Sequence, residues 1–263
     1  MQPLPVFAPY LKRIDAVPSP PSLENLRILQ EKHLQHVPFE TLSLHLGEPI
    51  DLNPDRLLDK IVARKRGGFC YELNHAFASL LEHLGYEVQF IMTRPFKADG
   101  ELAPPFAHLA LKVHLDAQDF LVDVGFNDGS VHPFPLMEGH IENGCTLQKA
   151  GDLWTYIDIK NDKKLYVFDE QEHPFEAFFE MCRHYATHED SGFRKKLFCG
   201  FQVPDHKMYL TDHKWVEDGQ ETFLDRPTFA DRLTRDFGIP LSEDQIETLY
   251  LACVQRKEKA EQA

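Results

Sequence analysis

Two adjacent glycines that lead directly into a helical pattern restrict the fold of this chain more than any other feature. Residues 66–74 read RGGFCYELN, and the glycines permit a tight turn and a close backbone approach. After them, apolar residues recur at the spacing of one helix face until Gly85: Phe69, Leu73, Ala76, Phe77, Leu80, Leu81 and Leu84. The pattern predicts that Cys70 stands in the first turn of a helix that ends at Gly85.

A cysteine in the first turn of a helix lies close to free backbone N–H groups and to the positive end of the helix dipole. That environment favours the thiolate, which is the nucleophilic form of the side chain. Arg64, Lys65 and Arg66 add positive charge just before it. A buried structural cysteine at a helix start explains the same run, because cysteine is often buried. The run alone leaves both interpretations open.

Composition and charge restrict the class of protein. The chain has 263 residues, 43% of them apolar and 27% charged, which is ordinary for a soluble globular protein. A formal charge of −14 argues against general nucleic-acid binding, which needs a basic surface. No apolar run reaches the length of a transmembrane helix, and residues 1–18 lack the apolar core of a signal peptide. Five cysteines without a CxxC pair predict reduced thiols and a cytoplasmic protein. The oligomeric state stays open.

Hydrophobic periodicity divides the chain into three predicted parts, over residues 1–85, 86–190 and 191–263. The first part is helical, with helices expected over 23–34 (capped by Ser22), 54–63 and from Cys70 onward. The second part predicts an antiparallel sheet or small barrel from strands at 87–92, 108–115, 120–126, 154–159 and 164–168. The third part is mixed, with strands at 208–210 and 221–224, a helix at 227–236 and a last helix opened by a Ser242 capping box.

His108 and Asp123 have the side chains that a cysteine nucleophile needs. His108 begins a predicted strand, on the face opposite its leucines. Asp123 interrupts an otherwise apolar strand, where a carboxylate must be solvated or paired. In this interpretation His108 takes the proton of the Cys70 thiol, and Asp123 orients and stabilises the imidazolium.

The hairpin register between the two strands decides whether His108 meets Asp123. A loop at 117–118 places Lys112 opposite Asp123 and leaves His108 about 13 Å away along the strand. A turn centred near 115–116 brings His108 opposite Asp123. Both registers put the two side chains on one face of the sheet, so a surface pair of Lys112 and Asp123 stays open beside the triad.

Five segments of this sequence resemble the arylamine N-acetyltransferases. Residues 66–74 are similar, almost letter for letter, to the segment that carries the family's nucleophile. Residues 108–111 (HLAL) resemble the segment with the catalytic histidine, and residues 121–126 (LVDVGF) resemble the segment with the aspartate. Residues 10–14 (YLKRI) and 37–40 (VPFE) match further segments in order. The likeness spans most of the chain.

The resemblance implies an α+β fold: an N-terminal helical bundle with Cys70, a central antiparallel β-barrel with His108 and Asp123, and a C-terminal α/β lid. It thereby favours the triad register. The implied enzyme, of the kind that metabolises xenobiotics, is an acyltransferase. It moves an acetyl group from acetyl-coenzyme A, a substrate rather than a bound cofactor, to an arylamine, hydrazine or arylhydroxylamine. We expect a ping-pong mechanism through acetyl-Cys70.

Three residues depart from the family's pattern. Asn127 follows the DVGF segment where the family usually has glycine, and because Asn tolerates the left-handed conformation, we expect the loop to keep its shape. Asp128 follows in a loop that lies by the coenzyme A phosphates in the family, and its charge is expected to repel them. Thr41 stands where the family usually has Asn, a change that we expect to be structural.

The remaining predictions concern contacts with the two substrates. The turn after Asp123 is expected to offer backbone N–H groups to the coenzyme, from a set made of Gly125, Phe126, Asn127, Gly129 and Ser130. Aromatic walls for the acceptor are expected from Phe69, Phe126 and Phe201, with Phe193 as a further candidate. The cations at 194–196 either contact phosphates or form a solvated surface. No metal site is predicted, since the group Cys182, His184 and His188 lacks the glutamate of zinc hydrolases.

Three other functions stay open at this stage. A papain-like or transglutaminase-like cysteine hydrolase uses the same order of Cys, His and Asp, although the RGGFC context argues against it. A catalytically impaired homologue would bind coenzyme A or an arylamine without acylation of Cys70. An acyltransferase with a longer acyl donor would share the whole site.

Overall fold

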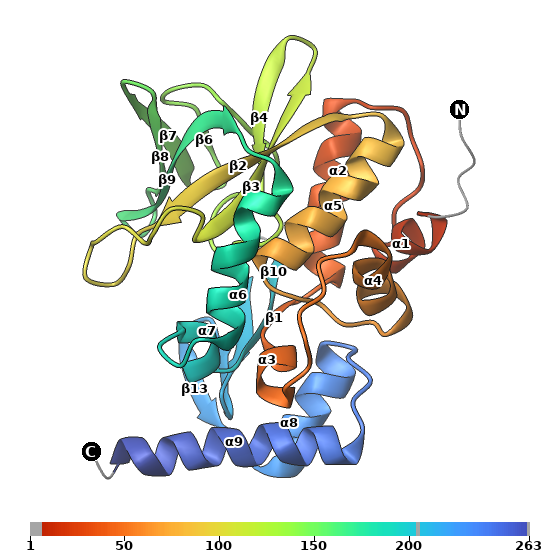
Figure 1. The fold of residues 1–263 in the computed structure, drawn as a ribbon, viewed down its shortest axis with the longest axis vertical. Helices are drawn as coiled ribbons and strands as arrows, with labels where there is room; N and C mark the ends of the chain where they lie inside the picture. The colour runs from red at the N-terminus through yellow and green to blue at the C-terminus, as the bar shows by residue number, and fades with distance from the viewer. Residues whose placement is uncertain (1–6, 204–205, 262–263) are drawn as a thin grey trace.

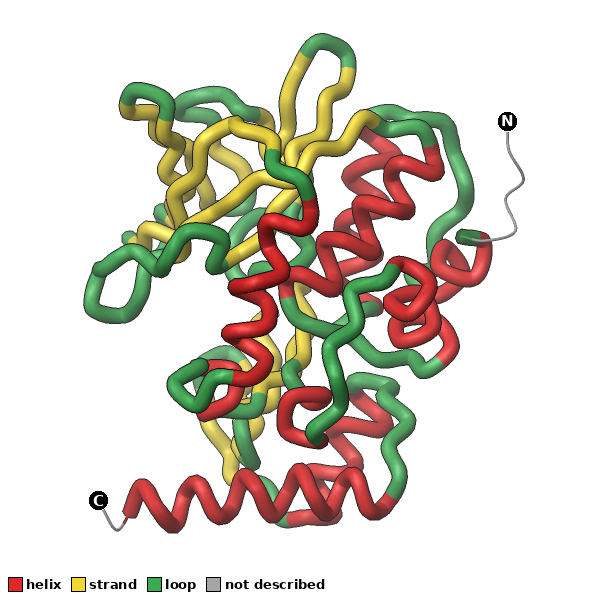
Figure 2. The backbone as a smooth tube through the Cα atoms, viewed as in Figure 1, coloured by secondary structure: helices red, strands yellow, loops and turns green. Residues whose placement is uncertain are grey.

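The structure is a computed structural model that describes residues 7–203 and 206–261. Two sheets and several helices make up the α+β fold, which confirms the predicted class. Figure 1 shows the larger sheet beside the long helices, with the last helix running across the opposite end of the molecule. The strands form two separate groups, as Figure 2 shows.

The N-terminal part is helical, as predicted. Its elements are α1 (Ala8–Arg13), α2 (Leu23–His36), α3 (Leu42–Leu46), α4 (Pro54–Leu58), the π-helical turn η1 (Asp59–Ala63) and α5 (Cys70–Leu84). Ser22 caps α2, where its hydroxyl accepts a 3.1 Å hydrogen bond from the N–H of Asn25. Gly85, at φ 95°, ends α5 in the left-handed conformation that glycine adopts at low cost.

The larger sheet has eight antiparallel strands in the order β5-β4-β3-β2-β9-β8-β7-β6. The strands are β2 (Glu87–Pro95), β3 (His108–Leu115), β4 (Gln118–Val122), β5 (Phe134–Pro135), β6 (Ile141–Glu142), β7 (Cys145–Ala150), β8 (Leu153–Asp158) and β9 (Lys163–Glu172). One face packs on α2 and α5, where Leu111 and Val113 share a core with Leu26 and Phe77. The long helices and the sheet are therefore held together by one apolar layer.

A smaller sheet forms the lid, our name for β10–β13 with α8, η3 and α9. Its elements are β10 (Phe198–Val203), β11 (His206–Thr211), β12 (Lys214–Glu217), β13 (Gln220–Phe223), α8 (Arg226–Asp231), η3 (Arg232–Asp236) and α9 (Glu243–Glu261). Between the sheets lie η2 (Phe175–Phe178), α6 (Phe179–Thr187) and α7 (Gly192–Lys195). Strand β1 (Phe39–Glu40) comes from the N-terminal part but pairs with β10, so the two parts interlock.

A strand is present where one was expected over 120–126, but its bounds differ, and both expected hairpin registers are wrong. Strand β4 ends at Val122, and Leu111 pairs with Val122 across a two-residue turn at Asp116 and Ala117. Both turn residues have positive φ, at 51° and 62°, as a tight hairpin turn requires. Asp123 therefore lies beyond the last pair of the ladder, where the chain turns away from the strand.

Within the described residues, no helix combines the length and the apolar character needed to span a bilayer. All five cysteines are buried and none is in a disulfide.

The turn before α5 lies against residues 37–40, which explains why two glycines precede Cys70. The N–H of Glu40 donates to the carbonyl of Gly68 at 2.9 Å. A Cβ atom on Gly67 would lie 1.8 Å from the carbonyl oxygen of Pro38, and real side chains cannot approach so closely. The glycine is therefore required by close backbone packing.

We expect Gly67→Ala to destabilise the protein by about 2–3 kcal/mol, because the new methyl group forces the two backbone segments apart. Urea unfolding followed by circular dichroism measures the effect. The control is Gly192→Ala, where an added Cβ meets no atom within 4 Å and the expected change is within about 0.5 kcal/mol. An unchanged urea midpoint for Gly67→Ala would contradict this account of the turn.

Candidate active site

Cys70 is the first residue of α5, as predicted, and its exposure is 1%. Two buried ion pairs hold the turn that precedes it. Arg66 Nε lies 2.9 Å from Glu40 Oε1, and Lys60 Nζ lies 2.7 Å from Glu72 Oε1. Because loss of one partner from a buried pair leaves an uncompensated charge, these contacts fix the start of the helix.

Glu72 also receives a 3.2 Å hydrogen bond from the N–H of Phe69, the residue just before the helix. The N–H groups of Cys70 and Tyr71 have no acceptor among the described residues. They are the free donors that a helix start leaves unsatisfied. Two of the cations before Cys70 are paired with carboxylates. Arg64 is exposed beside Asp59, and Arg66 is buried against Glu40.

The structure brings the side chains of His108 and Asp123 together, and their catalytic role stays a prediction. His108 is the first residue of β3, and its Nε2 lies 2.7 Å from Asp123 Oδ2. With Nε2 bound to the carboxylate, Nδ1 is left for the thiol of Cys70, which is a further hydrogen-bond partner of this ring. Lys112 does not pair with Asp123; its ammonium donates instead to the carbonyl of Glu170 at 3.2 Å.

Four donors satisfy the Asp123 carboxylate, which is 9% exposed. Oδ1 accepts from Asn74 Nδ2 and from the N–H of Gly125, both at 2.9 Å. Oδ2 accepts from His108 and from the hydroxyl of Tyr166, the latter at 3.2 Å. Sequence reasoning missed Asn74 and Tyr166. A signal for Asn74 was present, because it stands four residues after Cys70 and so shares its helix face.

The electrostatic surroundings keep His108 protonated. Burial alone lowers the pKa of this imidazole, but the charge and hydrogen bond of Asp123, with a contribution from Cys70, outweigh that effect and raise the pKa to about 10. At neutral pH the ring is therefore an imidazolium, with the Asp123 carboxylate on one nitrogen and the Cys70 sulfur as the other partner.

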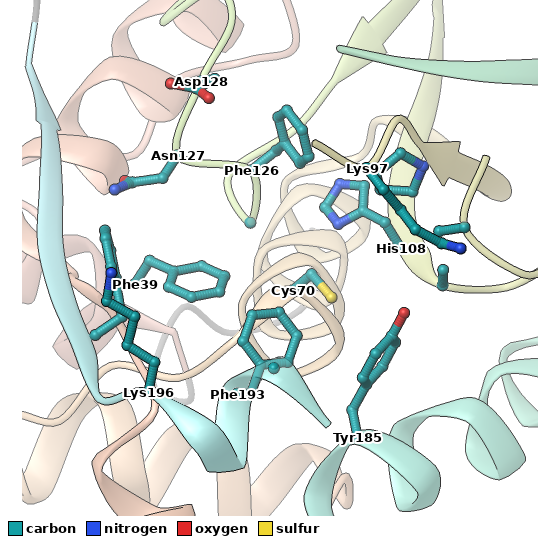
Figure 3. Close-up of a pocket in the computed structure, with 16 residues that line it drawn as sticks. Phe39, Cys70, Lys97, His108, Phe126, Asn127, Asp128, Tyr185, Phe193 and Lys196 are labelled. Atoms are coloured by element: carbon teal, nitrogen blue, oxygen red, sulfur yellow. The ribbon is translucent and has the colours of Figure 1, made fainter. Parts of the chain in front are cut away.

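Cys70 and His108 open into a cavity of about 490 Å³, which Figure 3 shows. Aromatic side chains line much of it: Phe39, Phe126, Tyr185, Phe193 and Phe198. Lys97 and Lys196 bring two cations to the same cavity. A largely apolar pocket with a few placed polar groups is the usual form of a small-molecule site.

The structure brings some of the predicted contact residues to this pocket and leaves others out. Gly125, Phe126 and Asn127 line it, and Phe193 does as well. Phe69 is instead part of a buried cluster at 1% exposure, and Phe201 lines a different cavity. Of the cations at 194–196, only the last lines the pocket.

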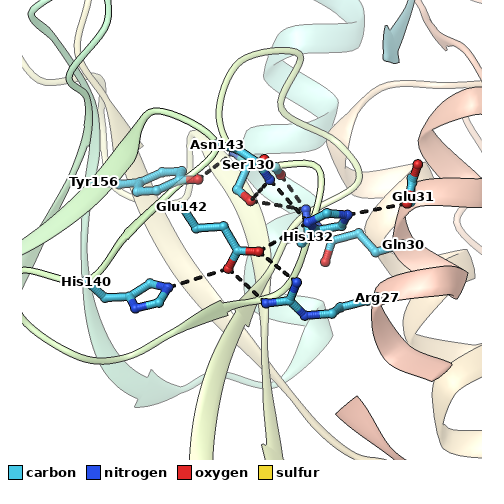
Figure 4. Close-up of polar contacts among 9 residues, drawn as sticks. All are labelled: Arg27, Gln30, Glu31, Ser130, His132, His140, Glu142, Asn143 and Tyr156. Carbon is cyan, nitrogen blue, oxygen red and sulfur yellow. Dashed lines mark hydrogen bonds and ion pairs between the residues drawn. The ribbon is translucent and has the colours of Figure 1, made fainter. Parts of the chain in front are cut away.

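Ser130 and Gly129 also lie outside the pocket lining. The N–H of Ser130 donates to Tyr156 Oη at 2.6 Å, and its hydroxyl accepts from Asn143 at 3.1 Å. Its carbonyl accepts from Gln30 at 3.4 Å. Figure 4 shows Ser130 in a polar network between α2 and the sheet. These contacts make Ser130 an anchor of the loop, with its polar groups occupied within the protein.

The structure shows the surroundings of the two departures in this loop. Asn127 does not have positive φ, so the tolerance of Asn for the left-handed conformation is not needed at this position. It faces β10 instead, where a Cβ on Gly200 would lie 3.2 Å from its amide nitrogen. Asp128 Oδ2 is 2.9 Å from Lys163 Nζ, which offsets the negative charge that was expected to repel phosphates.

Thr41 joins the N-terminal part to the lid. Its hydroxyl accepts a 3.0 Å hydrogen bond from the N–H of Phe198, and its own N–H donates to the carbonyl of Phe198 at 3.0 Å. Over residues 7–203 and 206–261, no three His, Cys, Asp or Glu side chains form a group able to hold a metal ion.

Comparison with known proteins identifies the family. The N-acetyltransferase family model matches residues 22–246. Arylamine N-acetyltransferase, pineal gland isozyme NAT-3, of Gallus gallus is 32% identical in an alignment of 223 residues, and the match covers 75% of this chain and 77% of that protein. The chain belongs to the arylamine N-acetyltransferase family. This confirms the resemblance and the expected acyltransferase class.

Solved structures of arylamine N-acetyltransferases share the fold over nearly the whole chain. The structure from Mycobacterium marinum in complex with CoA has a TM-score of 0.85 at 27% identity, covering 93% of this chain and 98% of that one. The structure from M. tuberculosis has a TM-score of 0.85 at 27% identity and covers 93% and 99%. The arrangement of helices, large sheet and lid is thus the arylamine N-acetyltransferase fold.

For this family member, Asp123→Asn is expected to lower the pKa of His108 from about 10, because it removes the negative charge that favours the imidazolium. Acetyl transfer should fall by about 10²- to 10⁴-fold. A pH titration of the His108 ring by NMR measures the first effect directly.

The matched control is Tyr166→Phe, which removes one hydrogen bond to Asp123 and leaves its charge in place. Its His108 titration should stay close to that of the wild type. Equal titrations in the wild type and Asp123→Asn would show that the carboxylate does not set the charge of the ring.

Proposed function

We propose that this protein transfers an acetyl group from acetyl-coenzyme A to an arylamine, hydrazine or arylhydroxylamine acceptor, with Cys70 as nucleophile. The observation that carries the proposal is the chain of contacts from Cys70 to His108 to Asp123 at an aromatic cavity. Family membership and the CoA complex of the M. marinum relative support coenzyme A as the acyl carrier.

In the first half-reaction the Cys70 thiolate, beside the His108 imidazolium, attacks the carbonyl carbon of the thioester. The free N–H groups of Cys70 and Tyr71 are placed to stabilise the negative charge on the carbonyl oxygen. The bond from carbon to the coenzyme sulfur breaks, and the His108 imidazolium gives its proton to the leaving sulfur. Free coenzyme A and acetyl-Cys70 remain, with His108 neutral.

In the second half-reaction the amine nitrogen attacks acetyl-Cys70, and neutral His108 accepts the proton that this nitrogen loses. The carbon–sulfur bond breaks, and the thiolate and imidazolium return. Aromatic walls from Phe126, Phe193 and Phe39 suit a flat aromatic acceptor, because aromatic rings pair favourably in offset or edge-to-face arrangements.

The coenzyme is proposed to enter with its phosphates toward Lys97 and Lys196, the two cations of the cavity. Gly125, Phe126 and Asn127 are the proposed coenzyme contacts from the turn after Asp123. The ion pair of Asp128 with Lys163 argues against an impaired coenzyme site. A reduced cytoplasmic setting stays a prediction, supported by the five free cysteines.

The test is initial-rate kinetics with acetyl-coenzyme A and 4-aminobenzoate varied against each other. Release of coenzyme A before the acceptor binds predicts parallel double-reciprocal lines. Intersecting lines would mean that both substrates bind together and would refute the ping-pong order. Amide or peptide cleavage without coenzyme A would favour the hydrolase instead, and faster acylation by propionyl-coenzyme A would revise the donor.

A further inference from the structure

One face of η2 and α6 packs on the start of α5 and brings a tyrosine to the Cys70 pocket. Phe178 and Cys182, four positions apart, are buried in the cluster that also contains Cys70 and Tyr71. Tyr185 follows Cys182 by three positions, and residues three or four apart share a face of a helix. Tyr185 accordingly lines the pocket. The packing of α6 thus places this side chain beside the nucleophile.

Contacts with neighbouring residues hold the Tyr185 ring in position. The ring meets that of Phe193 edge to face, with centroids 5.3 Å apart and an angle of 68° between the planes. The carbonyl of Tyr185 accepts a 2.7 Å hydrogen bond from the hydroxyl of Ser191, a residue that is 2% exposed. A side chain that is ordered before a ligand binds loses little conformational freedom on binding. Tyr185 is therefore suited to orient a ligand.

The hydroxyl of Tyr185 is directed into the pocket, toward the side of Cys70 and His108, as Figure 3 shows. The side chain is half-buried, and its hydroxyl oxygen is not sealed from the cavity. Among residues 7–203 and 206–261 this hydroxyl has no hydrogen-bond partner. A molecule in the pocket can therefore reach an unoccupied hydrogen-bonding group close to the reacting atoms.

Two other tyrosines near the site use their hydroxyls within the protein. Tyr71 donates to the carbonyl of Phe106 at 2.7 Å, and Tyr166 donates to Asp123 at 3.2 Å. Pocket water is a second explanation for the unpartnered hydroxyl of Tyr185. An aromatic acceptor that fills this largely apolar pocket displaces that water, and a buried hydroxyl without a partner is costly. The bound acceptor must then supply the partner.

The attacking amine has one N–H group that the mechanism leaves without a partner. A primary amine has two N–H groups, and His108 accepts the proton of only one of them. A tyrosine hydroxyl accepts hydrogen bonds through its oxygen. Burial raises the pKa of Tyr185, and the charge of Cys70 adds to that effect, so the hydroxyl keeps its proton at neutral pH. A neutral hydroxyl beside Cys70 is thus a suitable partner for the second N–H.

We propose that Tyr185 binds the acceptor, with its hydroxyl accepting a hydrogen bond from the N–H of the amine that His108 does not take. This role rests on the acetyl transfer through Cys70 proposed above and concerns its second half-reaction. With both N–H groups held, the lone pair of the nitrogen is directed at the acetyl carbon, which favours attack. The first half-reaction involves no amine and does not need the hydroxyl.

The test compares the two half-reactions of Tyr185→Phe, which keeps the ring and removes only the hydroxyl. Rapid-quench intact mass follows the uptake of acetyl from acetyl-coenzyme A and then its loss to 4-methoxyaniline, an uncharged primary arylamine. The rate of uptake should equal that of the wild type, because no amine takes part. The loss to the amine should be about 3- to 10-fold slower, which is the effect of one neutral hydrogen bond. The urea midpoint checks that the variant folds.

The matched control is Tyr209→Phe. Tyr209 stacks on the pocket residue Phe198, with centroids 5.2 Å apart, but does not itself line the pocket. Both half-reactions of this control should keep the wild-type rates.

Equal slowing of both half-reactions in Tyr185→Phe would place the hydroxyl on the carbonyl oxygen, which is present in each, and would overturn the proposal. A folded Tyr185→Phe variant with an unchanged rate of loss to the amine would overturn it as well, and would leave the acetyl transfer through Cys70 intact. A wild type that takes up no acetyl group would refute the proposed function itself, and this role with it.

Discussion

The buried carboxylate of Asp123 is the interaction on which the rest of the site depends. A carboxylate removed from water is costly unless donors surround it, and its donors come from separate parts of the fold. Asn74 belongs to α5, His108 to β3 and Tyr166 to β9. The same contacts that satisfy the charge therefore set the position of the Cys70 helix against the large sheet. The contacts that stabilise the fold around Asp123 are therefore the same contacts that align the site.

The lid completes the pocket from the other side. Phe39 lies on β1, which pairs with β10 of the lid, and its ring is 5.7 Å from that of Phe198. Thr41 adds two hydrogen bonds to the same strand. Because these lid contacts place two of the pocket's aromatic walls, the shape seen by an acceptor depends on lid packing as much as on the residues around Cys70.

Local chemistry in the sequence was enough to predict several elements. Ser22 and Ser242 cap helices with their own hydroxyls, at 3.1 and 3.2 Å, and Gly85 ends α5 where the pattern placed it. Such features depend on residues three or four apart and need no tertiary information. The end of β4 could not be predicted from such local features, because Asp123 leaves the strand and contacts donors on α5 and β9.

The site could be predicted only in part for the same reason. Cys70 is recognisable from its glycines and its helix pattern. The contact of His108 with Asp123 arises because Asp123 leaves β4 beyond the last pair of the ladder, which local pattern did not predict. Phe201 was expected in the acceptor pocket, but the orientation of β10 turns Phe198 toward Cys70 and Phe201 away from it. Strand orientation is set by packing across the whole lid, which residue spacing does not encode.

Intact-mass measurement after brief exposure to acetyl-coenzyme A, without an acceptor, tests the central claim most directly. The account predicts one acetyl adduct on the wild type, none on Cys70→Ala, and loss of the adduct when an arylamine is added. An unmodified wild type whose Cys70 still reacts rapidly with iodoacetamide would contradict it, since a working thiolate would then reject this donor.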